Sequence, residues 1–433
     1  MPQVPAPRAP FEEIAPPLTA DQALQEAARC LYCFDAPCTR ACPTAIDVPA
    51  FIKKIATGNL VGSARVIFEA NVLGASCARV CPVDVLCEGA CVEKTLLERP
   101  IPIAGLQRHA TDHVLERGVD VLRAGAPTGR SVGIVGAGPA GLGAAAELRK
   151  LGHAVTVYDE RRWSGGLNTY GMAEYKQTAQ LALLEVEQVA RLGVVFEQGV
   201  AVGKQVSVAE LLQRHDALFV GVGLGSTNRL GVPGDHLAVE ALAWIERLKS
   251  EPDSMPRLAG QRAVIVGGGN TAIDAVTQAR RLGAEATLVY RRTERQMSAY
   301  RYEIELARSM GCALLFERPP VRVEEGALIV QAPHGEERLE CDLVIAAVGQ
   351  MKRVAFLRDL PGVSAEDHGR LVVDPRTGQT NNPRIFAGGD CVNGGKEAVN
   401  AVAEGKLAAW GLDSYLRGLD RQRPTASRQP EVA

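Results

Sequence analysis

Long apolar runs are absent from this 433-residue chain, whose apolar stretches are broken by Gly, Asn or a charge well short of about 18 residues. No transmembrane helix is therefore expected. The first residues are rich in Pro and carry Glu12 and Glu13, so they lack the basic and apolar regions of a signal peptide. A charge bias is also absent, because 48 Lys and Arg face 50 Asp and Glu, which disfavours a nucleic-acid partner. We expect a cytoplasmic, globular protein.

Cysteine, by contrast, is plentiful: the chain has eleven, and without an export signal they argue against a disulfide framework. Eight lie close together, at positions 30, 33, 38, 42, 77, 81, 87 and 91. Two of them, Cys42 and Cys81, are followed by Pro, which favours cubane iron–sulfur ligation. Zinc is the alternative, but only one C-x2-C pair occurs. Cys312, Cys341 and Cys391 have no partner at a redox spacing and are expected to be structural.

The pattern of apolar residues changes along the chain. After a Pro-rich, extended tail (1–18), short apolar runs between the cysteines predict a helical domain over 19–127. Strand and helix then alternate: SVGIVG, a helix over 139–151 and AVTVYD are followed later by RAVIVG, a helix over 271–282 and ATLVY. The two βαβ units predict two Rossmann-like domains, so the fold class is α plus α/β. Residues 420–433 are polar and expected to be disordered.

The first βαβ unit carries a complete dinucleotide fingerprint, G-x-G-x-x-G, between its strand and its helix. The motif consists of Gly136, Ala137, Gly138, Pro139, Ala140 and Gly141. Its first Gly permits a tight turn, the second lets the backbone approach a pyrophosphate, and the third lets the helix pack on the strand. Asp159 ends the next strand, where a carboxylate accepts hydrogen bonds from ribose hydroxyls and repels a 2′-phosphate. This unit predicts an FAD site.

The second βαβ unit carries the variant G-x-G-x-x-A. It consists of Gly267, Gly268, Gly269, Asn270, Thr271 and Ala272. Its second strand leads into Arg291 and Arg292, and arginine there suits the 2′-phosphate of NADP(H). Two solvent-exposed arginines at a strand end are the alternative. The unit predicts an NAD(P)H site that favours NADPH.

Four segments of the cysteine-rich region resemble dihydropyrimidine dehydrogenases: CLYCFDAPC, CPTAID, CARVCP and LCE. From Asp21 to Leu416 the chain resembles the NAD(P)H-oxidising small subunits of the bacterial two-subunit enzymes of that family. The small subunits of glutamate synthase share both dinucleotide domains and are the alternative, although their first cysteine run is spaced differently.

The resemblance implies the ligands of two 4Fe-4S clusters. One cluster would take Cys30, Cys33, Cys38 and Cys91. The other would take Cys42, Cys81, Cys87 and a glutamine that Gln107 matches. Cys77 would then be spare.

The resemblance also implies how the dinucleotide domains are arranged. The NAD(P) domain (230–349) would be inserted in the FAD domain (128–229 and 350–419). Further FAD contacts would come from Leu167, Lys176, Val202, Gly389, Asp390 and Ala398.

Hydride transfer from nicotinamide to flavin needs alignment, and no Ser-His-Asp or Cys-His arrangement is visible. Because the chain also lacks a (β/α)8 segment, an FMN site and a C-x2-C-x2-C-x3-C-P run, the resemblance implies a catalytic partner subunit with FMN and further iron–sulfur clusters. Together, as a heterotetramer, they would interconvert uracil or thymine and the 5,6-dihydropyrimidines. A non-catalytic redox sensor is the rival from another functional class.

Overall fold

The computed structural model describes residues 13–251, 257–366 and 369–418. The chain forms two compact units. Unit 1 contains Thr169–Gln180 and Gly225–Met351, and unit 2 contains Ala15–Asn168, Leu181–Leu224 and the chain from Lys352 onward. Most of unit 1 is thus inserted in the sequence of unit 2, which agrees with the expected fold class. Of the two expected tails, 420–433 and most of 1–18 lie outside the described residues.

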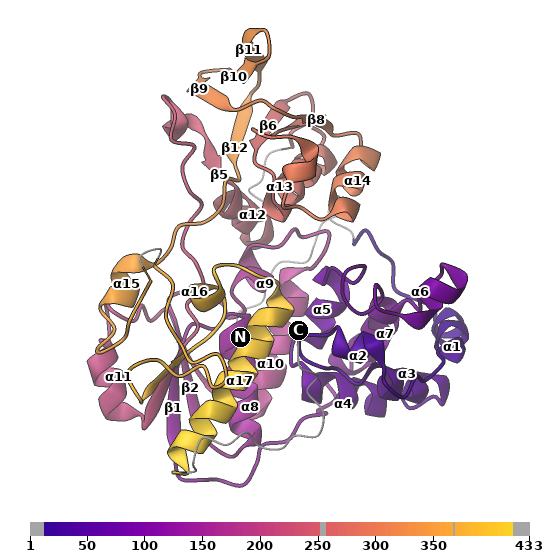
Figure 1. Ribbon diagram of the computed structural model, residues 1–433, viewed down its shortest axis with the longest axis vertical. Helices are drawn as coiled ribbons and strands as arrows, with labels where there is room; N and C mark the ends of the chain where they lie inside the picture. Colours follow the sequence, from indigo (N-terminus) through magenta and orange to yellow (C-terminus); the bar gives the residue numbers. More distant parts are fainter. Residues whose placement is uncertain (1–12, 252–256, 367–368, 419–433) are drawn as a thin grey trace. The chain divides into compact units, whose positions relative to one another are not determined.

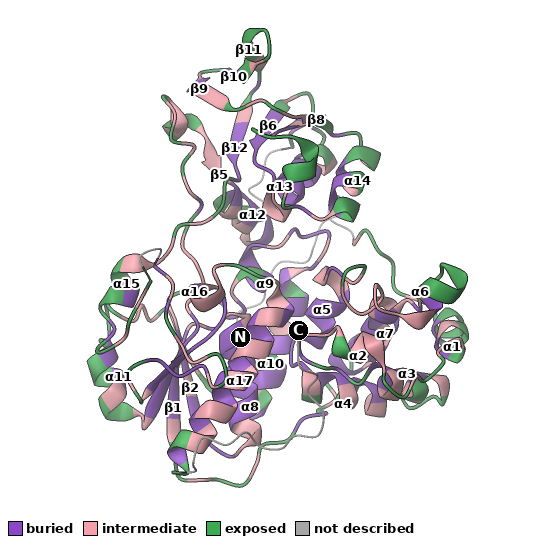
Figure 2. Ribbon diagram, viewed as in Figure 1, coloured by how far each residue is buried: buried purple, intermediate pink, exposed green. Residues whose placement is uncertain are grey.

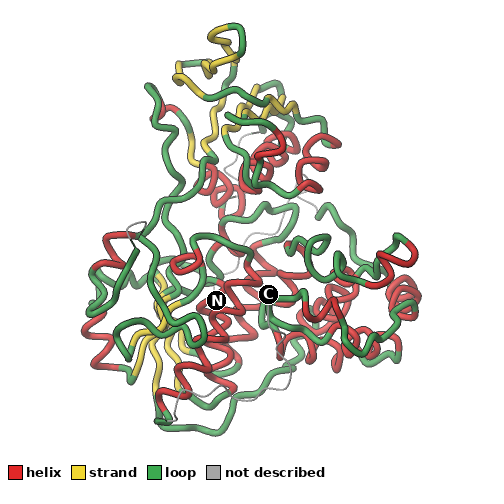
Figure 3. Tube along the Cα trace, viewed as in Figure 1, coloured by secondary structure: helices red, strands yellow, loops and turns green. Residues whose placement is uncertain are grey.

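Helices form the N-terminal part of unit 2, and no strand occurs among its described residues before Ser131 (Figures 1 and 3). They are α1 (Ala20–Ala28), α2 (Pro37–Arg40), α3 (Val48–Ala56), α4 (Leu60–Ala70), α5 (Gly74–Val80), α6 (Val92–Leu97) and α7 (Ile103–Leu115). The side chains of Thr19, Asp47 and Asn59 start three of them by accepting a hydrogen bond from a first-turn N–H. The helical prediction is confirmed.

A parallel sheet of order β13-β4-β1-β2-β3 follows in unit 2. Its strands are β1 (Ser131–Val135), β2 (Ala154–Asp159), β3 (Val195–Gln198), β4 (Ala217–Val220) and β13 (Ile385–Ala387). The associated helices are α8 (Pro139–Lys150), α9 (Leu167–Tyr170), α10 (Ala179–Arg191), α11 (Val208–Arg214), α15 (Val354–Arg358), α16 (Asp390–Asn393) and α17 (Ala398–Leu416). Figure 2 shows that α8, β1 and β2 are largely buried. The strand order reverses between β1 and β4, and doubly wound sheets bind nucleotides beyond such a switch point.

The cysteine-rich helices and this sheet share one apolar core. Phe51 and Leu106 of the helices belong to the same buried cluster as Ile134 of β1, Leu148 of α8 and Leu412 of α17. Cys30, Cys38, Cys42, Cys87 and Cys91 pack against that cluster. The helical segment and the first dinucleotide fold therefore stabilise one another within a single unit.

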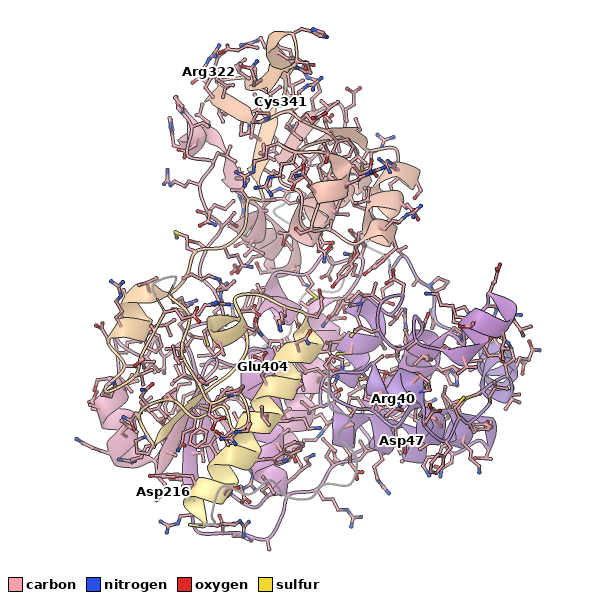
Figure 4. The ribbon with its side chains drawn as sticks, viewed as in Figure 1. Arg40, Asp47, Asp216, Arg322, Cys341 and Glu404 are labelled. Atoms are coloured by element: carbon pink, nitrogen blue, oxygen red, sulfur yellow. The ribbon has the colours of Figure 1, made fainter. Side chains whose placement is uncertain are left out.

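Unit 1 has its own parallel sheet, of order β5-β12-β6-β7-β8, and a small antiparallel sheet, β11-β10-β9. The parallel strands are β5 (Val239–Glu240), β6 (Arg262–Val266), β7 (Glu285–Val289), β8 (Ala313–Leu315) and β12 (Leu343–Ala346). The antiparallel strands are β9 (Pro320–Glu324), β10 (Ala327–Ala332) and β11 (Gly335–Glu340), and the helices are α12 (Ala241–Ser250), α13 (Asn270–Arg281) and α14 (Arg301–Ser309). Figure 4 marks Arg322 on β9 and Cys341 after β11. Among the described residues no helix is suited to cross a membrane.

A buried carboxylate joins the two halves of unit 2. Glu185 of α10 accepts hydrogen bonds from the backbone N–H groups of Ala75 (2.7 Å) and Ser76 (3.0 Å), and from the Ser76 hydroxyl. These N–H groups begin α5, whose N-cap residue Leu73 offers no capping side chain. Burial raises the pKa of Glu185 to about 7, although the hydrogen bonds from Ser76 and Ala75 oppose the rise. A helix of the dinucleotide fold thus caps a helix of the cysteine-rich region.

This raised pKa makes the stability of unit 2 depend on pH. An unfolded Glu loses its proton near pH 4.5, whereas native Glu185 keeps it to about pH 7. Its contribution to the free energy of unfolding is therefore complete below pH 4.5 and falls by about 1.4 kcal/mol per pH unit as the pH rises to about 7.

Glu185→Gln should lack this decline, because the amide does not ionise. We expect the thermal midpoint of the variant, relative to the wild type, to rise between about pH 5 and about pH 7.5 in differential scanning fluorimetry. A midpoint difference that does not change with pH would contradict a protonated, buried Glu185.

Candidate functional site

The first fingerprint lies at the carboxyl ends of three neighbouring strands of unit 2. Gly136 follows β1 in the left-handed region (φ 101°), and a Cβ there would lie 2.5 Å from the carbonyl oxygen of Gly221, which follows β4. A Cβ on Gly141 would lie 1.9 Å from the carbonyl oxygen of Gly136. The turn and the close helix packing therefore both require glycine, as the sequence motif predicts.

Gly138 differs from Gly136 and Gly141, because a side chain at this position would not collide with the surrounding protein. A Cβ built there meets no atom nearer than the Cα of Gly166, at 3.9 Å. Gly138 is the N-cap residue of α8, so this space lies where the helix presents free backbone N–H groups. An anionic pyrophosphate fits such a cradle, since the helix dipole and the N–H groups both favour negative charge.

Asp159 lies at the end of β2 beside this loop. Its carboxylate accepts hydrogen bonds from the N–H of Ala137 (2.7 Å) and of Arg161 (2.8 Å). Burial raises the pKa of Asp159, while these hydrogen bonds lower it. Asp159 therefore orders the fingerprint loop, a contact that the sequence pattern did not reveal.

The turn after β13 completes the same cradle. A Cβ on Gly389 would lie 2.9 Å from the Cβ of Ala140, which places the turn against the fingerprint helix. The Gly389 N–H donates to Glu404 on α17 (2.7 Å), and Asp390 accepts from the N–H of Lys396 (3.2 Å). Figure 4 labels Glu404 on α17. Glu404, which the sequence analysis missed, thus holds the predicted turn in place.

The other residues assigned to the flavin by resemblance are dispersed. Ala398 is the first residue of α17, Leu167 follows Gly166, which lies against Gly138, and Val202 forms a β-bridge with Val206. All three belong to unit 2.

Lys176 belongs instead to unit 1, where its ammonium pairs with Asp274 (2.5 Å) and Glu303 (2.6 Å). Burial lowers the pKa of Lys176, but the two carboxylates outweigh burial and raise it overall. Its charge is thus balanced within unit 1 by Asp274 and Glu303, whereas the resemblance predicts a contact with FAD.

Unit 1 has a pocket of about 470 Å³ at the carboxyl ends of β6, β7 and β12. It is lined by Gly267, Gly268, Gly269 and Thr271 of the second fingerprint, by Tyr290 and Arg291 after β7, and by Ala347 to Gln350 after β12. A Cβ on Gly267 would lie 2.3 Å from the carbonyl oxygen of Ala347, so this turn also requires glycine. Ala272 is buried, and Asn270 accepts a hydrogen bond from the N–H of Tyr300 (3.0 Å).

The two arginines of the sequence motif are not equivalent. Arg291 lines the pocket, whereas Arg292 does not. Within the described residues Arg291 has no carboxylate partner, which leaves its guanidinium available for an anion.

Three further residues line this pocket although they belong to no sequence motif. Thr227 is only 3% exposed, lines the pocket, and its hydroxyl has no hydrogen-bond partner among the described residues. Tyr290 covers Gly268, and Ser298 lies 3.4 Å from the position of a Cβ on Gly269. Tyr290 and Ser298 belong to the connection between β7 and α14, and Thr227 precedes β5, so only the fold brings Thr227 to the other two.

The cysteines form two sets. Cys30, Cys33, Cys38 and Cys91 line one apolar recess together with residues such as Ile52 and Ile103. Burial, together with the nearby charges of Cys91 and Cys30, raises the pKa of Cys38 to about 12. Thiolates in this recess therefore need positive charge beside them, which the irons of a cluster provide.

The second set contains Cys42, Cys81 and Cys87. A hydrogen bond with Cys77, then burial, then the charges of Cys77, Cys42 and Cys87 raise the pKa of Cys81. Burial likewise raises the pKa of Cys87, with Glu88 and Cys42 contributing. Gln107 is buried, and its Nε2 donates to the carbonyl oxygen of Gly74 at 2.6 Å. This bond fixes the amide and leaves its Oε1 as the atom suited to a metal.

The remaining cysteines lie elsewhere. Cys77 is buried and accepts a hydrogen bond from Asn71 Nδ2 (3.1 Å), and Cys312, Cys341 and Cys391 are buried and free. Over the described parts of the chain, no three His, Cys, Asp or Glu side chains converge on a single metal-ion position.

Two family models match the chain. The pyridine nucleotide-disulphide oxidoreductase model matches residues 130–405, and the model of dihydropyrimidine dehydrogenase domain II, 4Fe-4S cluster, matches residues 7–119. The NAD-dependent dihydropyrimidine dehydrogenase subunit PreT of Escherichia coli K12 is 34% identical, over 94% of this chain and 98% of its own length. The chain belongs to the PreT family of pyridine nucleotide-disulphide oxidoreductases.

Other relatives of this family share the architecture. The glutamate synthase [NADPH] small chain of Halomonas elongata is also 34% identical, over 94% of this chain and 93% of its own length. Among solved structures, T. acidophilum thioredoxin reductase has a similar fold, with a TM-score of 0.55 and 22% identity over 66% of this chain and 98% of that chain. Mycobacterium tuberculosis FprA in complex with NADPH has a TM-score of 0.54 and 19% identity over 67% of this chain and 85% of that chain. These likenesses support the paired dinucleotide fold. The protein is an NAD(P)-dependent oxidoreductase with a 4Fe-4S domain.

The assignment of the cysteines to two separate clusters can be tested by measuring how much iron each variant binds. Cys33→Ala should remove about half of the iron and leave flavin content unchanged, because only one of two clusters loses a ligand. Cys77→Ala is the matched control and should keep all of the iron. Iron, acid-labile sulfide and flavin are measured after anaerobic purification. Equal losses in both variants would contradict the proposed ligand set.

Proposed function

We propose that this protein is the NAD(P)H-oxidising subunit of a dihydropyrimidine dehydrogenase. The match of residues 7–119 to domain II of that enzyme carries the proposal, because both cysteine sets lie in this segment. The 34% identity to PreT over nearly its whole length supports it.

The residues have distinct roles in this proposal. The loop from Gly136 to Gly141, with Asp159 and the Gly389–Asp390 turn, binds FAD, and the pocket of unit 1 binds NAD(P)H. Cys30, Cys33, Cys38 and Cys91 hold one cluster, and Cys42, Cys81, Cys87 and Gln107 hold the other. When bound, FAD accepts hydride from NAD(P)H and supplies single electrons to iron–sulfur clusters. The chain itself supplies binding and alignment, and therefore needs no acid–base residue.

A partner subunit completes the reaction. PreT and the glutamate synthase small chain are both named as parts of larger enzymes. We place this chain in the cytoplasm, as part of a heterotetramer with an FMN- and iron–sulfur-containing subunit that reduces uracil or thymine. Its thiol sets suit that reducing compartment.

A glutamate synthase small chain is the second candidate, because a protein of that name is equally similar in sequence. The two candidates share the nucleotide and flavin chemistry and differ only in the partner that receives the electrons.

The experiment reconstitutes this chain with the FMN-containing subunit of a bacterial dihydropyrimidine dehydrogenase, or with a glutamate synthase large subunit. We expect uracil-dependent oxidation of NAD(P)H and formation of dihydrouracil with the first partner only. Glutamate formation from glutamine and 2-oxoglutarate with the second partner, and no dihydrouracil with the first, would reverse the assignment.

The preference of the protein for NADPH over NADH tests the proposed role of the pocket in unit 1. Charge-assisted hydrogen bonds to a phosphate contribute about 1.5–3 kcal/mol each before desolvation, and a net gain of about 1.4 kcal/mol gives a tenfold preference. Because Arg291 lines the pocket, we expect the wild type to prefer NADPH.

Arg291→Ala should lower the ratio of kcat/KM for NADPH to that for NADH by about tenfold or more in dye reduction. Arg292→Ala is the control and should change the ratio little, because its side chain lies outside the pocket lining. A wild type that prefers NADH, or equal effects of the two variants, would show that Arg291 does not read a 2′-phosphate.

A further inference from the structure

A half-buried lysine on α17, Lys406, has no part in the binding roles assigned above. The ammonium of Lys406 donates to the carbonyl oxygen of Ala70 at the end of α4 and lies 5.7 Å from the ring centre of Trp410. A carbonyl dipole and an aromatic face stabilise a cation only in part, and an unpaired charge is costly to bury.

The carboxylate that interacts electrostatically with Lys406 already has other partners. Glu147 of α8 forms an ion pair with Lys150 (2.6 Å) and accepts a hydrogen bond from Trp410 Nε1 (2.9 Å). In the part of the chain that the structure describes, no carboxylate lies within ion-pair distance of Lys406. The ammonium therefore lacks a dedicated counter-charge.

The contact with Ala70 places Lys406 close to the second cysteine set. Ala70 is followed by Asn71, whose Nδ2 donates to Sγ of Cys77 at 3.1 Å, and Cys77 in turn forms a hydrogen bond with Cys81. The ammonium also interacts electrostatically with Cys42, which precedes α3. Cys42 is one of the three thiols of the second set, and it packs against the same apolar core as α17. In the proposed ligand set these three thiolates and a neutral amide give the cluster a net negative charge, which one-electron reduction increases.

The position of Lys406 is fixed by the flavin-binding fold. Its neighbour Gly405 packs directly on α8, where a Cβ would lie 2.1 Å from the carbonyl oxygen of Ala140 in the first fingerprint. Glu404, one residue earlier, holds the Gly389 turn. One turn of α17 thus contacts the FAD cradle and presents a cation toward the second cysteine set.

We propose that Lys406 is the counter-charge of the cluster bound by Cys42, Cys81, Cys87 and Gln107, and that it raises the reduction potential of that cluster. In the redox step the cluster gains one electron and Lys406 keeps its proton, so no bond forms or breaks. Lys406 acts through the field that it exerts on the cluster, because net charge and burial set the potentials of such clusters. The inference rests on the proposed ligand set.

The test uses the full-length protein, purified anaerobically, with Lys406→Met and Lys406→Arg. Midpoint potentials of both clusters are measured by reductive titration followed by electron paramagnetic resonance. We expect Lys406→Met to shift one cluster to a more negative potential, with the other unchanged, and Lys406→Arg to remain near the wild type. NADPH should still bleach the flavin of Lys406→Met but reduce a smaller fraction of that cluster.

Lys53→Met is the matched control, since Lys53 is an exposed lysine of α3 whose charge is screened by water. It should leave both potentials unchanged. An unchanged potential in Lys406→Met, or an equal shift in Lys53→Met, would overturn the proposal. If Lys406→Met loses a cluster that Lys406→Arg retains, a cation is required there, as proposed, whereas loss in both variants would show a packing role and overturn it. Absence of iron and sulfide from the wild type would refute the ligand set itself.

Discussion

The close packing of α8 between β1 and α17 is the constraint on which unit 2 depends. On one side, Gly141 lets α8 approach the turn after β1, and on the other side Gly405 lets α17 approach Ala140. A side chain at either glycine would collide with a backbone carbonyl oxygen, at 1.9 Å and 2.1 Å respectively. Because the backbones meet without side chains between them, the N-terminus of α8, the Gly389 turn and the start of α17 converge on one cradle.

The same packing connects the proposed flavin site with the cysteine-rich helices. Glu185 of α10 caps α5, and Lys406 of α17 donates to the end of α4. Both contacts are made by groups that are expensive to bury, and both lie beside the core that the helices share with the first sheet. The iron–sulfur region is therefore held by the dinucleotide fold itself, and a two-electron donor site and one-electron carriers occur in one compact unit.

Unit 1 has the same dinucleotide fold as unit 2 but different residues at the position that selects the nucleotide. Its fingerprint turn needs glycine for the same reason as the first, since a Cβ on Gly267 would collide with the carbonyl oxygen of Ala347. The difference lies after the second strand of each unit, where Asp159 ends β2 in unit 2 and Arg291 follows the end of β7 by two residues in unit 1. The acid is hydrogen-bonded to its own loop, whereas the arginine lines an open pocket, and this contrast supports separate sites for FAD and for a phosphorylated nicotinamide nucleotide.

The sequence alone determined the helical N-terminal segment, the two βαβ units with their fingerprints and the cysteine spacing, because these depend on local periodicity and on glycine at turns. It also indicated the family through its cysteine motifs. Only the tertiary structure decided that Arg291 lines the pocket and Arg292 does not, that Lys176 pairs with Asp274 and Glu303, and that Glu185 and Lys406 serve the cysteine-rich helices. Such side chains meet partners far away in sequence, so neither spacing nor residue type reveals their contacts. Their environment, and hence their charge and chemistry, arises only when the helices pack.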